Sequence, residues 1–327
     1  MFRTIVKCAV SSKKIDYDSQ LMMLGSCFTE YLGAQLKRLK FNVVINPFGI
    51  VFHPAPIANN LERMISGKLY TCDELQLHNE LWHSFDHHGR FSHPDPLVCL
   101  KRINDELQQA REQLARSELL FVTFGTAWAY ILKATGQVAS NCHKFPSSDF
   151  DRVRSDINEI CSIWTNAIAK LRQLNPAVRV VFSVSPIRHL RDGAHENSLS
   201  KSILLLAVER LNREVENTDY FPAYEIVLDD LRDYRFFDQD MAHPNAVAVN
   251  YIWQRFCETF INDCERQKMK KVENIVKAAE HKPIHKSSEH RKFTEDCIIK
   301  IEELKRQMPF LDFSFEIEKI IDSGTLS

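Results

Sequence analysis

Apolar runs alternate with helical segments along the chain, and this alternation restricts the fold more than any other feature. The runs read QLMMLGS, KFNVVINPFG, ELLFVTFGT and VRVVFSVSP, and YFPAYEIVLDDL is predicted to carry the last strand. Segments with apolar residues at helical spacing separate the runs, and HPNAVAVNYIWQRFCETFI forms the closing helix. One of the helical segments is expected to occupy much of residues 150–174. Because strands apolar on both faces are typical of parallel sheets, the sequence predicts an α/β protein, a three-layer α/β/α sandwich around a parallel sheet.

Ligands of such sheets bind at the carboxyl ends of the strands. The positions to inspect are therefore Gly25-Ser26, the stretch from Asn46 to Gly49, Gly125 to Trp128, and Ser185 to His189.

Composition excludes several classes of function. The 327 residues include 42 basic and 43 acidic ones, a net charge of −1, so we expect neither nucleic acid nor an anionic membrane as a partner. No apolar stretch is long enough to predict a signal peptide or a membrane span. The nine cysteines include no CxxC pair, which favours reduced thiols in the cytoplasm over disulfides or a zinc site. We expect no cofactor.

The chain changes character near Asn262, where a polar, charged stretch is followed by a helical run with Ile298, Ile301 and Leu304. We predict a domain of residues 1–260 and a helical C-terminal extension of residues 261–327. The extension is expected to pack on the domain or on a second copy, as a homo-oligomer; a mostly solvated tail is the alternative.

Ser26 lies on the predicted hinge between the first strand and its helix. Serine there is a good helix N-cap, which is the structural interpretation, and several hydrolase folds hold a nucleophile at this hinge. Hydrolysis by a serine also needs a base and a carboxylate that orients it. Asp240 and His243, three residues apart just before the closing helix, supply both. Together these residues favour a catalytic serine.

Long stretches of the chain, among them LGSCFTEYLGAQL, FNVVINPFGIVFHP, SVSPIRHLRDG and DMAHPN, resemble the GSCFA family of the SGNH/GDSL hydrolase-like superfamily. The resemblance runs from about residue 20 to 260, although Thr29 replaces the alanine of the name-giving motif. It implies a flavodoxin-like fold, with Ser26 as nucleophile and Asp240 and His243 as its partners.

The resemblance also implies an oxyanion hole made by the Ser26 N–H, a glycine after the second strand and an asparagine after the third. Gly49 fits the glycine. Residues 125–128, however, read Gly-Thr-Ala-Trp, so the asparagine is missing from its usual place. Asn141 is a candidate substitute, and His143 is another.

Cys27 is an alternative nucleophile, because the helix N-terminus would favour its thiolate. A residue one step into a helix usually turns toward the core, however, which favours Ser26.

The segment LHNELWHSFDHHGRFSHP holds five histidines, and with Asp86 it suggests a metal site. Its alternating pattern instead favours a hairpin, so we predict no metal and a substrate-facing hairpin that presents Trp82 and His83. Structural or surface histidines are the third interpretation.

Further candidates for substrate binding follow the third and fourth strands. Trp128 and His143 could line an acyl or sugar pocket or merely cap strand ends. Arg188, His189 and Arg191 lie on the ligand edge, where arginine holds either a substrate carboxylate or phosphate or an ordinary ion-pair partner.

These residues together predict a serine ester hydrolase, and the resemblance to the wider superfamily implies a small acyl group on a carbohydrate or another polar acceptor. Two alternatives remain open at this point. One is an O-acyltransferase with the same triad. The other is a non-catalytic binding module, which the missing asparagine favours.

Overall fold

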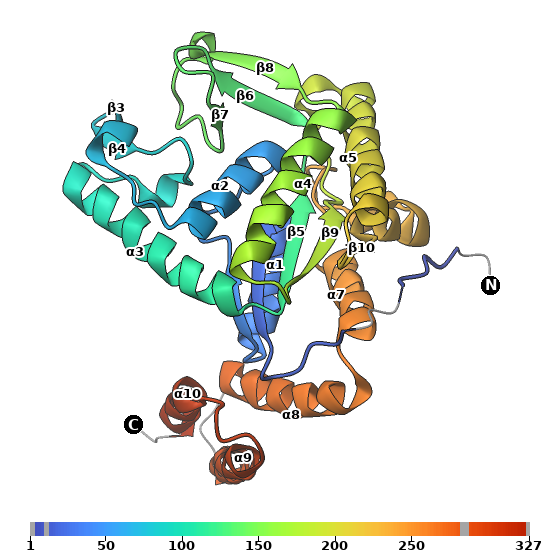
Figure 1. The fold of residues 1–327 in the computed structure, drawn as a ribbon. Helices are drawn as coiled ribbons and strands as arrows, with labels where there is room; N and C mark the ends of the chain where they lie inside the picture. Colours follow the sequence, from blue (N-terminus) through green and yellow to red (C-terminus); the bar gives the residue numbers. More distant parts are fainter. Residues whose placement is uncertain (1–3, 10–12, 282–287, 325–327) are drawn as a thin grey trace.

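A computed structural model describes residues 4–9, 13–281 and 288–324, so residues 282–287 of the predicted extension lie outside it. Five parallel strands form the central sheet in the order β10-β9-β5-β1-β2 (Figure 1). Their bounds are β1 Gln20–Gly25, β2 Asn42–Ile45, β5 Leu119–Phe124, β9 Arg179–Val184 and β10 Thr218–Phe221. The predicted α/β fold with a parallel sheet is thus confirmed.

Helices cover both faces of this sheet, which makes the three layers (Figure 1). One face packs against α2 (Pro54–Ser66), α3 (Pro96–Arg116), α4 (Ile157–Leu174) and α5 (Ala194–Glu214). The other packs against α1 (Cys27–Arg38) and α7 (Ala246–Phe260). Within β5, Leu120 and Val122 belong to the first core and Leu119 and Phe121 to the second, so alternate side chains of one strand enter different layers.

The strand order reverses between β1 and β5, because β2 lies on one side of β1 and all later strands lie on the other. A crevice forms at such a switch point, outside the carboxyl ends of the strands. Ser26 follows β1 directly and therefore lies at this point.

Smaller sheets lie beyond the carboxyl edge. An antiparallel sheet, here called the flap, contains β6 (Trp128–Leu132), β7 (Val138–Ala139) and β8 (Phe150–Arg154) in the order β7-β6-β8. A hairpin pairs β3 (Gln76–His78) with β4 (Leu81–His83). Figure 1 shows the flap above the carboxyl ends of the central strands.

Two predicted elements differ from the structure. The helix expected from about residue 150 begins at Ile157, because Asp156 and Glu159 form a capping box there and residues 150–154 pair with β6. The last strand ends at Phe221. Pro222 follows it, and the apolar residues beyond belong to a short helix, α6 (Ala223–Glu225), and a π-helical segment, Ile226–Leu231.

The C-terminal extension is helical and contains α8 (Asp263–Glu280), α9 (Ser288–Gln307) and α10 (Ser314–Gly324). Val272, Ile301 and Ile320 from these helices belong to the same apolar core as α1 and α7. Arg38 binds Glu280 through two hydrogen bonds, and Lys40 lies 2.7 Å from Glu316, so the extension is also tied to the end of α1.

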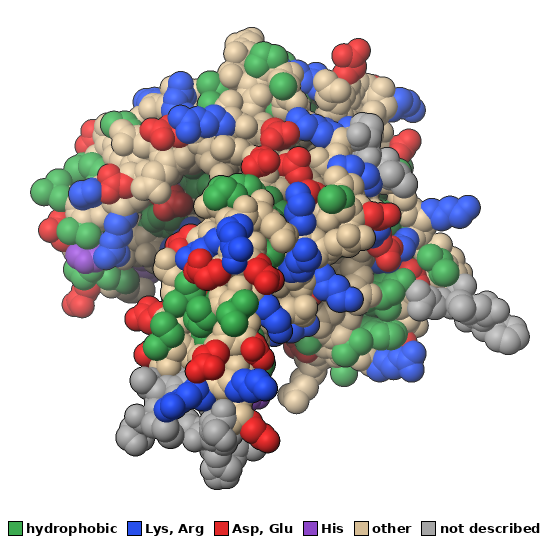
Figure 2. All heavy atoms as spheres, turned by 90° about the horizontal axis from the view of Figure 1, so that it is seen from below, with side chains coloured by type: hydrophobic (Ala, Val, Ile, Leu, Met, Phe, Trp, Pro, Cys, Tyr) green, Lys and Arg blue, Asp and Glu red, His purple; other side chains and the backbone are tan. Residues whose placement is uncertain are grey.

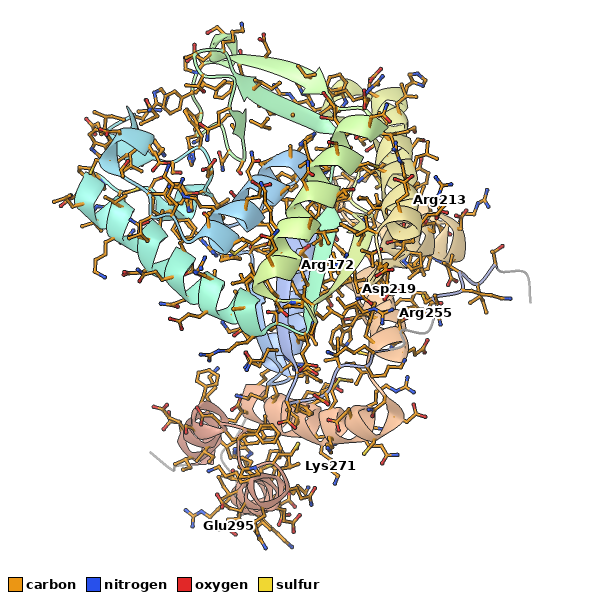
Figure 3. The ribbon with its side chains drawn as sticks, in the orientation of Figure 1. Arg172, Arg213, Asp219, Arg255, Lys271 and Glu295 are labelled. Carbon is orange, nitrogen blue, oxygen red and sulfur yellow. The ribbon has the colours of Figure 1, made fainter. Side chains whose placement is uncertain are left out.

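Charged side chains cover the outside of the extension. Exposed Lys271 on α8 and Glu295 on α9 extend away from the domain (Figure 3). Seen from below, acidic and basic side chains are interspersed (Figure 2), which agrees with the near-zero net charge. None of the described helices is long and apolar enough to cross a bilayer.

Candidate active site

Ser26 is the N-cap residue of α1, with only 1% of its surface exposed. Its hydroxyl makes no capping bond and has no hydrogen-bond partner among the described residues. Gly25 before it has φ +133°, and a Cβ there would lie 2.2 Å from the Thr123 carbonyl oxygen. Only glycine fits this close approach of β1 to β5, which fixes the backbone that presents Ser26.

Asn46 holds the same backbone from the end of β2. Its Oδ1 accepts a hydrogen bond of 2.8 Å from the Gly25 N–H, and its own N–H donates to Met23 at 2.9 Å. Its φ of +43° suits asparagine better than most residues. The Nδ2 donor is buried without a partner. Asn46 was predicted to lie at the carboxyl end of a strand, but the sequence did not predict its role.

Asp240 and His243 form a tightly bonded pair. Asp240 Oδ2 lies 2.5 Å from His243 Nδ1, and its Oδ1 accepts the N–H groups of Ala242 and His243, each at 2.9 Å. These backbone bonds, with that of His243 first, lower the pKa of Asp240 to about 2. Asp240 is therefore a carboxylate at ordinary pH, fitted to orient the imidazole. Both side chains are about half exposed.

The loop that carries this pair is attached to the carboxyl edge of the sheet. The N–H of Arg188, in the loop after β9, donates to the Ala242 carbonyl at 3.0 Å. The neighbouring His189 is close enough to His243 for their charges to interact. Within the described residues no hydrogen bond joins His243 to the Ser26 hydroxyl, so that contact stays a prediction.

Lys201 is a buried amine for which the sequence predicted no role. It projects from α5, is 1% exposed, and donates to the carbonyl oxygens of Gly125 at 2.6 Å and Ser185 at 2.8 Å. These carbonyls lie just beyond the ends of β5 and β9. Burial lowers the pKa of Lys201 to about 7, with the neighbouring Cys27 opposing the shift. A buried lysine whose pKa is lowered, next to the alternative nucleophile Cys27, is typical of functional sites.

Two of the predicted oxyanion donors, Gly49 and Asn141, form hydrogen bonds within their own loops. The Gly49 N–H donates to the Asn46 carbonyl at 2.7 Å, so it is used in a turn. Asn141 accepts the His143 N–H at 2.9 Å through Oδ1. Asn141 lines the large cavity described next, whereas Ser26 does not. His143 is bound through Nε2 to the Ser84 carbonyl at 2.8 Å.

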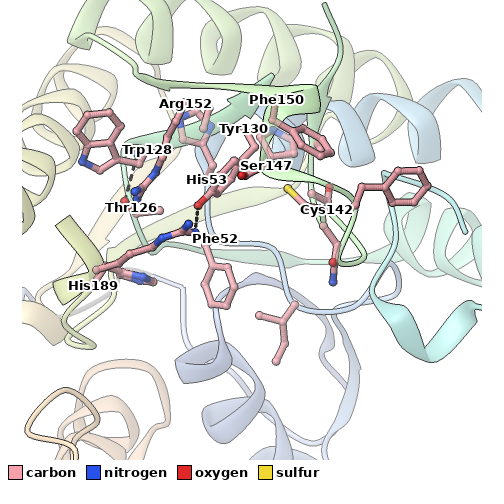
Figure 4. A pocket seen from close by; sticks show the side chains of 18 of the residues that line it. Phe52, His53, Thr126, Trp128, Tyr130, Cys142, Ser147, Phe150, Arg152 and His189 are labelled. Carbon is pink, nitrogen blue, oxygen red and sulfur yellow. Dashed lines mark hydrogen bonds between the residues drawn. The ribbon is translucent and has the colours of Figure 1, made fainter. Parts of the chain in front are cut away.

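A cavity of about 670 Å³ opens between the sheet edge and the flap. Phe52 and His189 lie on one side of it, and Trp128, Tyr130 and Phe150 lie on the other (Figure 4). Its size is within the range of small-molecule sites. Of the candidates for substrate binding, Trp128, His189 and Arg191 line this cavity.

The other predicted substrate residues do not line it. Arg188 borders a different hollow, beside Val227. Trp82 packs against the main core. His83 Nδ1 contacts Ser92 Oγ at 2.7 Å, its Nε2 contacts the His78 carbonyl at 3.1 Å, and its ring lies 4.5 Å from that of His143. The structure therefore gives His83 and His143 packing roles.

The histidine-rich segment contains the predicted hairpin. His87 is buried, contacts Ser84 Oγ at 2.9 Å and stacks on Phe48. Among the described residues, no group of three or more His, Cys, Asp or Glu side chains is arranged to hold a metal ion.

Cys27 is half-buried against the second core, and burial raises the pKa of its thiol. Burial therefore opposes formation of the thiolate that a cysteine nucleophile needs. This observation favours Ser26 over Cys27.

A sequence model of the GSCFA family matches residues 20–256. The chain belongs to the GSCFA family. A second model, described as the C-terminal domain of GSCFA domain proteins, matches residues 272–322. No curated protein matches the chain.

Three solved structures match the chain at low identity, two of them carbohydrate esterases and one an acetyl xylan esterase. One, of family 3, comes from Talaromyces cellulolyticus (TM-score 0.37, 9% identity, covering 78% of this chain and 99% of that one). An acetyl xylan esterase from Butyrivibrio proteoclasticus has a TM-score of 0.38 and 14% identity over 78% of this chain. A family 2 enzyme from Clostridium thermocellum has a TM-score of 0.37 and 10% identity over 76%. The match spans 65% and 64%, respectively, of the last two chains.

Proposed function

We propose that this GSCFA protein is a serine ester hydrolase related to the SGNH/GDSL superfamily. The observation that carries the proposal is the Asp240–His243 pair, with 2.5 Å between Oδ2 and Nδ1, on a loop attached to the sheet edge where Ser26 begins α1. A serine at a strand-to-helix hinge, with a carboxylate-oriented histidine at the same edge, has the parts needed for acyl transfer.

In the proposed reaction, Ser26 Oγ attacks the ester carbonyl carbon while His243 Nε2 takes the hydroxyl proton. The tetrahedral intermediate collapses, the ester C–O bond breaks, and the same proton passes to the leaving alcohol. Water then attacks the acyl-serine with His243 again as the base, and the carboxylic acid leaves. Asp240 keeps the Nδ1 proton facing its own Oδ2, so Nε2 stays free to accept.

The oxyanion would be held by the N–H groups of Ser26 and Gly49 and by the Asn141 amide. Gly49 must then exchange its turn bond to Asn46 for the oxyanion, whereas Asn141 uses only its oxygen within the loop. The acyl group is proposed to be small, and its acceptor a carbohydrate or another polar molecule bound in the 670 Å³ cavity.

A serine-directed fluorophosphonate probe and short p-nitrophenyl esters test this proposal directly. We expect the probe to label Ser26 and the protein to hydrolyse p-nitrophenyl acetate, with both signals lost in Ser26→Ala. A folded wild-type protein that neither reacts with the probe nor turns over the ester would contradict the proposal and favour a binding module.

A further inference from the structure

The cavity between the sheet edge and the flap is lined by basic and not by acidic side chains. None of its lining residues is acidic, whereas Arg152 and Arg191 both line it. Aromatic side chains from the flap and from the loop after β2 form part of its walls (Figure 4). A cavity with this lining attracts anions, because low-dielectric walls strengthen the field of the cations.

The two arginines differ in how their charge is balanced. Arg152 forms a two-pronged ion pair with Asp192, and its guanidinium lies 5.1 Å from the centroid of the Trp128 ring. Arg191 instead donates to the neutral hydroxyl of Tyr130, over whose ring it lies at 5.7 Å. In the part of the chain that the structure describes, no carboxylate lies within ion-pair distance of Arg191. Its charge is therefore available to a ligand.

His189, on the opposite wall of the cavity, is affected by the same positive electrostatic potential. Its Nε2 is buried without a hydrogen-bond partner. Burial, and after it the charges of Lys201, His243 and Arg152, lowers the pKa of His189 to about 3. The ring is thus neutral, and Lys201 and Arg152 are among the groups that disfavour its protonation.

The wall of the cavity is linked to the backbone of the candidate nucleophile. Ile50 and Phe52 line the cavity, and Val51 between them donates its N–H to the Gly25 carbonyl at 3.1 Å. Gly25 directly precedes Ser26. The segment 50–52 therefore connects one wall of the cavity to the backbone that presents the serine.

We propose that the substrate is an anionic ester, an acylated sugar acid or sugar phosphate, whose carboxylate or phosphate binds Arg191. Guanidinium pairs with either oxyanion through two parallel hydrogen bonds, and the aromatic walls accept the apolar face of a sugar ring. The inference rests on the proposed ester hydrolysis for its reaction, but the anion site itself is tested by binding alone.

Three sugars that differ only at C6 provide the test: glucose, glucuronate and glucose 6-phosphate. We expect calorimetry on the full chain to give at least tenfold tighter binding of one or both anions than of glucose. The order of the two anions tells a carboxylate site from a phosphate site. Arg191→Gln should remove the preference, and Arg191→Lys should keep part of it. Arg213→Gln, an exposed arginine of α5 (Figure 3), is the matched control and should bind like the wild type.

Equal binding of all three sugars, or a preference that survives in Arg191→Gln, would overturn the inference. Monoacetyl esters of the same sugars separate this result from the proposed function. Hydrolysis of p-nitrophenyl acetate without an anion preference would contradict only the proposed anion site. Anion binding through Arg191 in a protein that hydrolyses no ester would contradict only the proposed hydrolase activity.

Discussion

Lys201 Nζ lies 2.6 Å from the Gly125 carbonyl oxygen, so a fully buried amine donates a hydrogen bond to the backbone just after β5. Its second acceptor is the Ser185 carbonyl after β9. Ser200, the preceding residue of α5, accepts the Ala127 N–H through Oγ at 2.8 Å. Two successive residues of one helix thus hold the loop where the family resemblance led us to expect an asparagine.

The buried amine predicts an unusual dependence of stability on pH. The folded pKa of Lys201 is about 7, against 10.5 in an ordinary lysine. Between these values the unfolded chain holds one more proton than the folded chain, so stability rises with pH, by up to about 1.4 kcal/mol per unit. Lys201→Met lacks this contribution.

Urea unfolding of both proteins at pH 7, 8, 9 and 10 measures this contribution. The free energy of unfolding of the wild type, minus that of Lys201→Met, should increase steadily across the series. Cys27 and Tyr224, whose own pKa values are raised, face position 201 in both proteins and titrate in both unfolding series. A constant difference would show that Lys201 stays charged when folded.

The nucleophile is tested by a pair of neighbouring substitutions. Ser26→Ala should reduce ester turnover by on the order of 10⁴- to 10⁶-fold, because the hydroxyl that is proposed to form the acyl-enzyme is lost. Cys27→Ala should largely keep turnover, since that thiol is half-buried and its pKa is raised. The reverse pattern, with activity kept only in Ser26→Ala, would assign the reaction to the cysteine.

The close contact at Gly25 predicts that Gly25→Ala is severely destabilising. A methyl group would meet the Thr123 carbonyl oxygen at 2.2 Å, and φ of +133° is strained for alanine. We expect a loss on the order of 3 kcal/mol or more in the free energy of unfolding. Gly89→Ala is the control, because nothing lies within 4 Å of its Cβ position. Equal stability of the two variants would contradict this account of the hinge.

Asn141 remains the predicted third oxyanion donor. Asn141→Ala should lower kcat by on the order of 10²- to 10³-fold and leave KM nearly unchanged, as expected when one transition-state donor is lost. Ser148→Ala, an exposed position in the same part of the flap, is the control. A rise in KM at constant kcat would instead make Asn141 a ground-state binding residue.

The ion pair between Lys40 and Glu316 tests how firmly the extension is attached. Glu316 has only 6% of its side chain exposed, so Lys40→Met leaves a buried carboxylate without its partner. We expect a loss of about 1–3 kcal/mol in the free energy of unfolding, most of it recovered in Lys40→Met with Glu316→Gln. Lys101→Met breaks an exposed pair with Asp105 and should change stability by less than about 0.5 kcal/mol.

The fold could be predicted because its strands are continuous apolar runs, and the position of Ser26 follows from the end of the first run. The spacing of Asp240 and His243 places them on one side of a turn, which local geometry alone determines. Arg152 and Lys201 could not be assigned roles in the same way. Each lies far along the chain from Ser26. Only the packing of α5 and the position of the flap in the folded protein bring them to the sheet edge. The strand predicted beyond Phe221 was wrong, because an apolar run alone does not distinguish a strand from a buried helical segment.

The attachment of α1 has a consequence for protein engineering. This helix has 12 residues and is therefore about 18 Å long, with Ser26 at one end and the ion pairs of Arg38 and Lys40 with the extension at the other. A shortened chain designed for easier expression, with residues 262–327 removed, would uncover the apolar side of this helix and leave both cations unpaired. Trimming the C-terminus would therefore also alter the support of the serine, although no residue near the serine would have been changed.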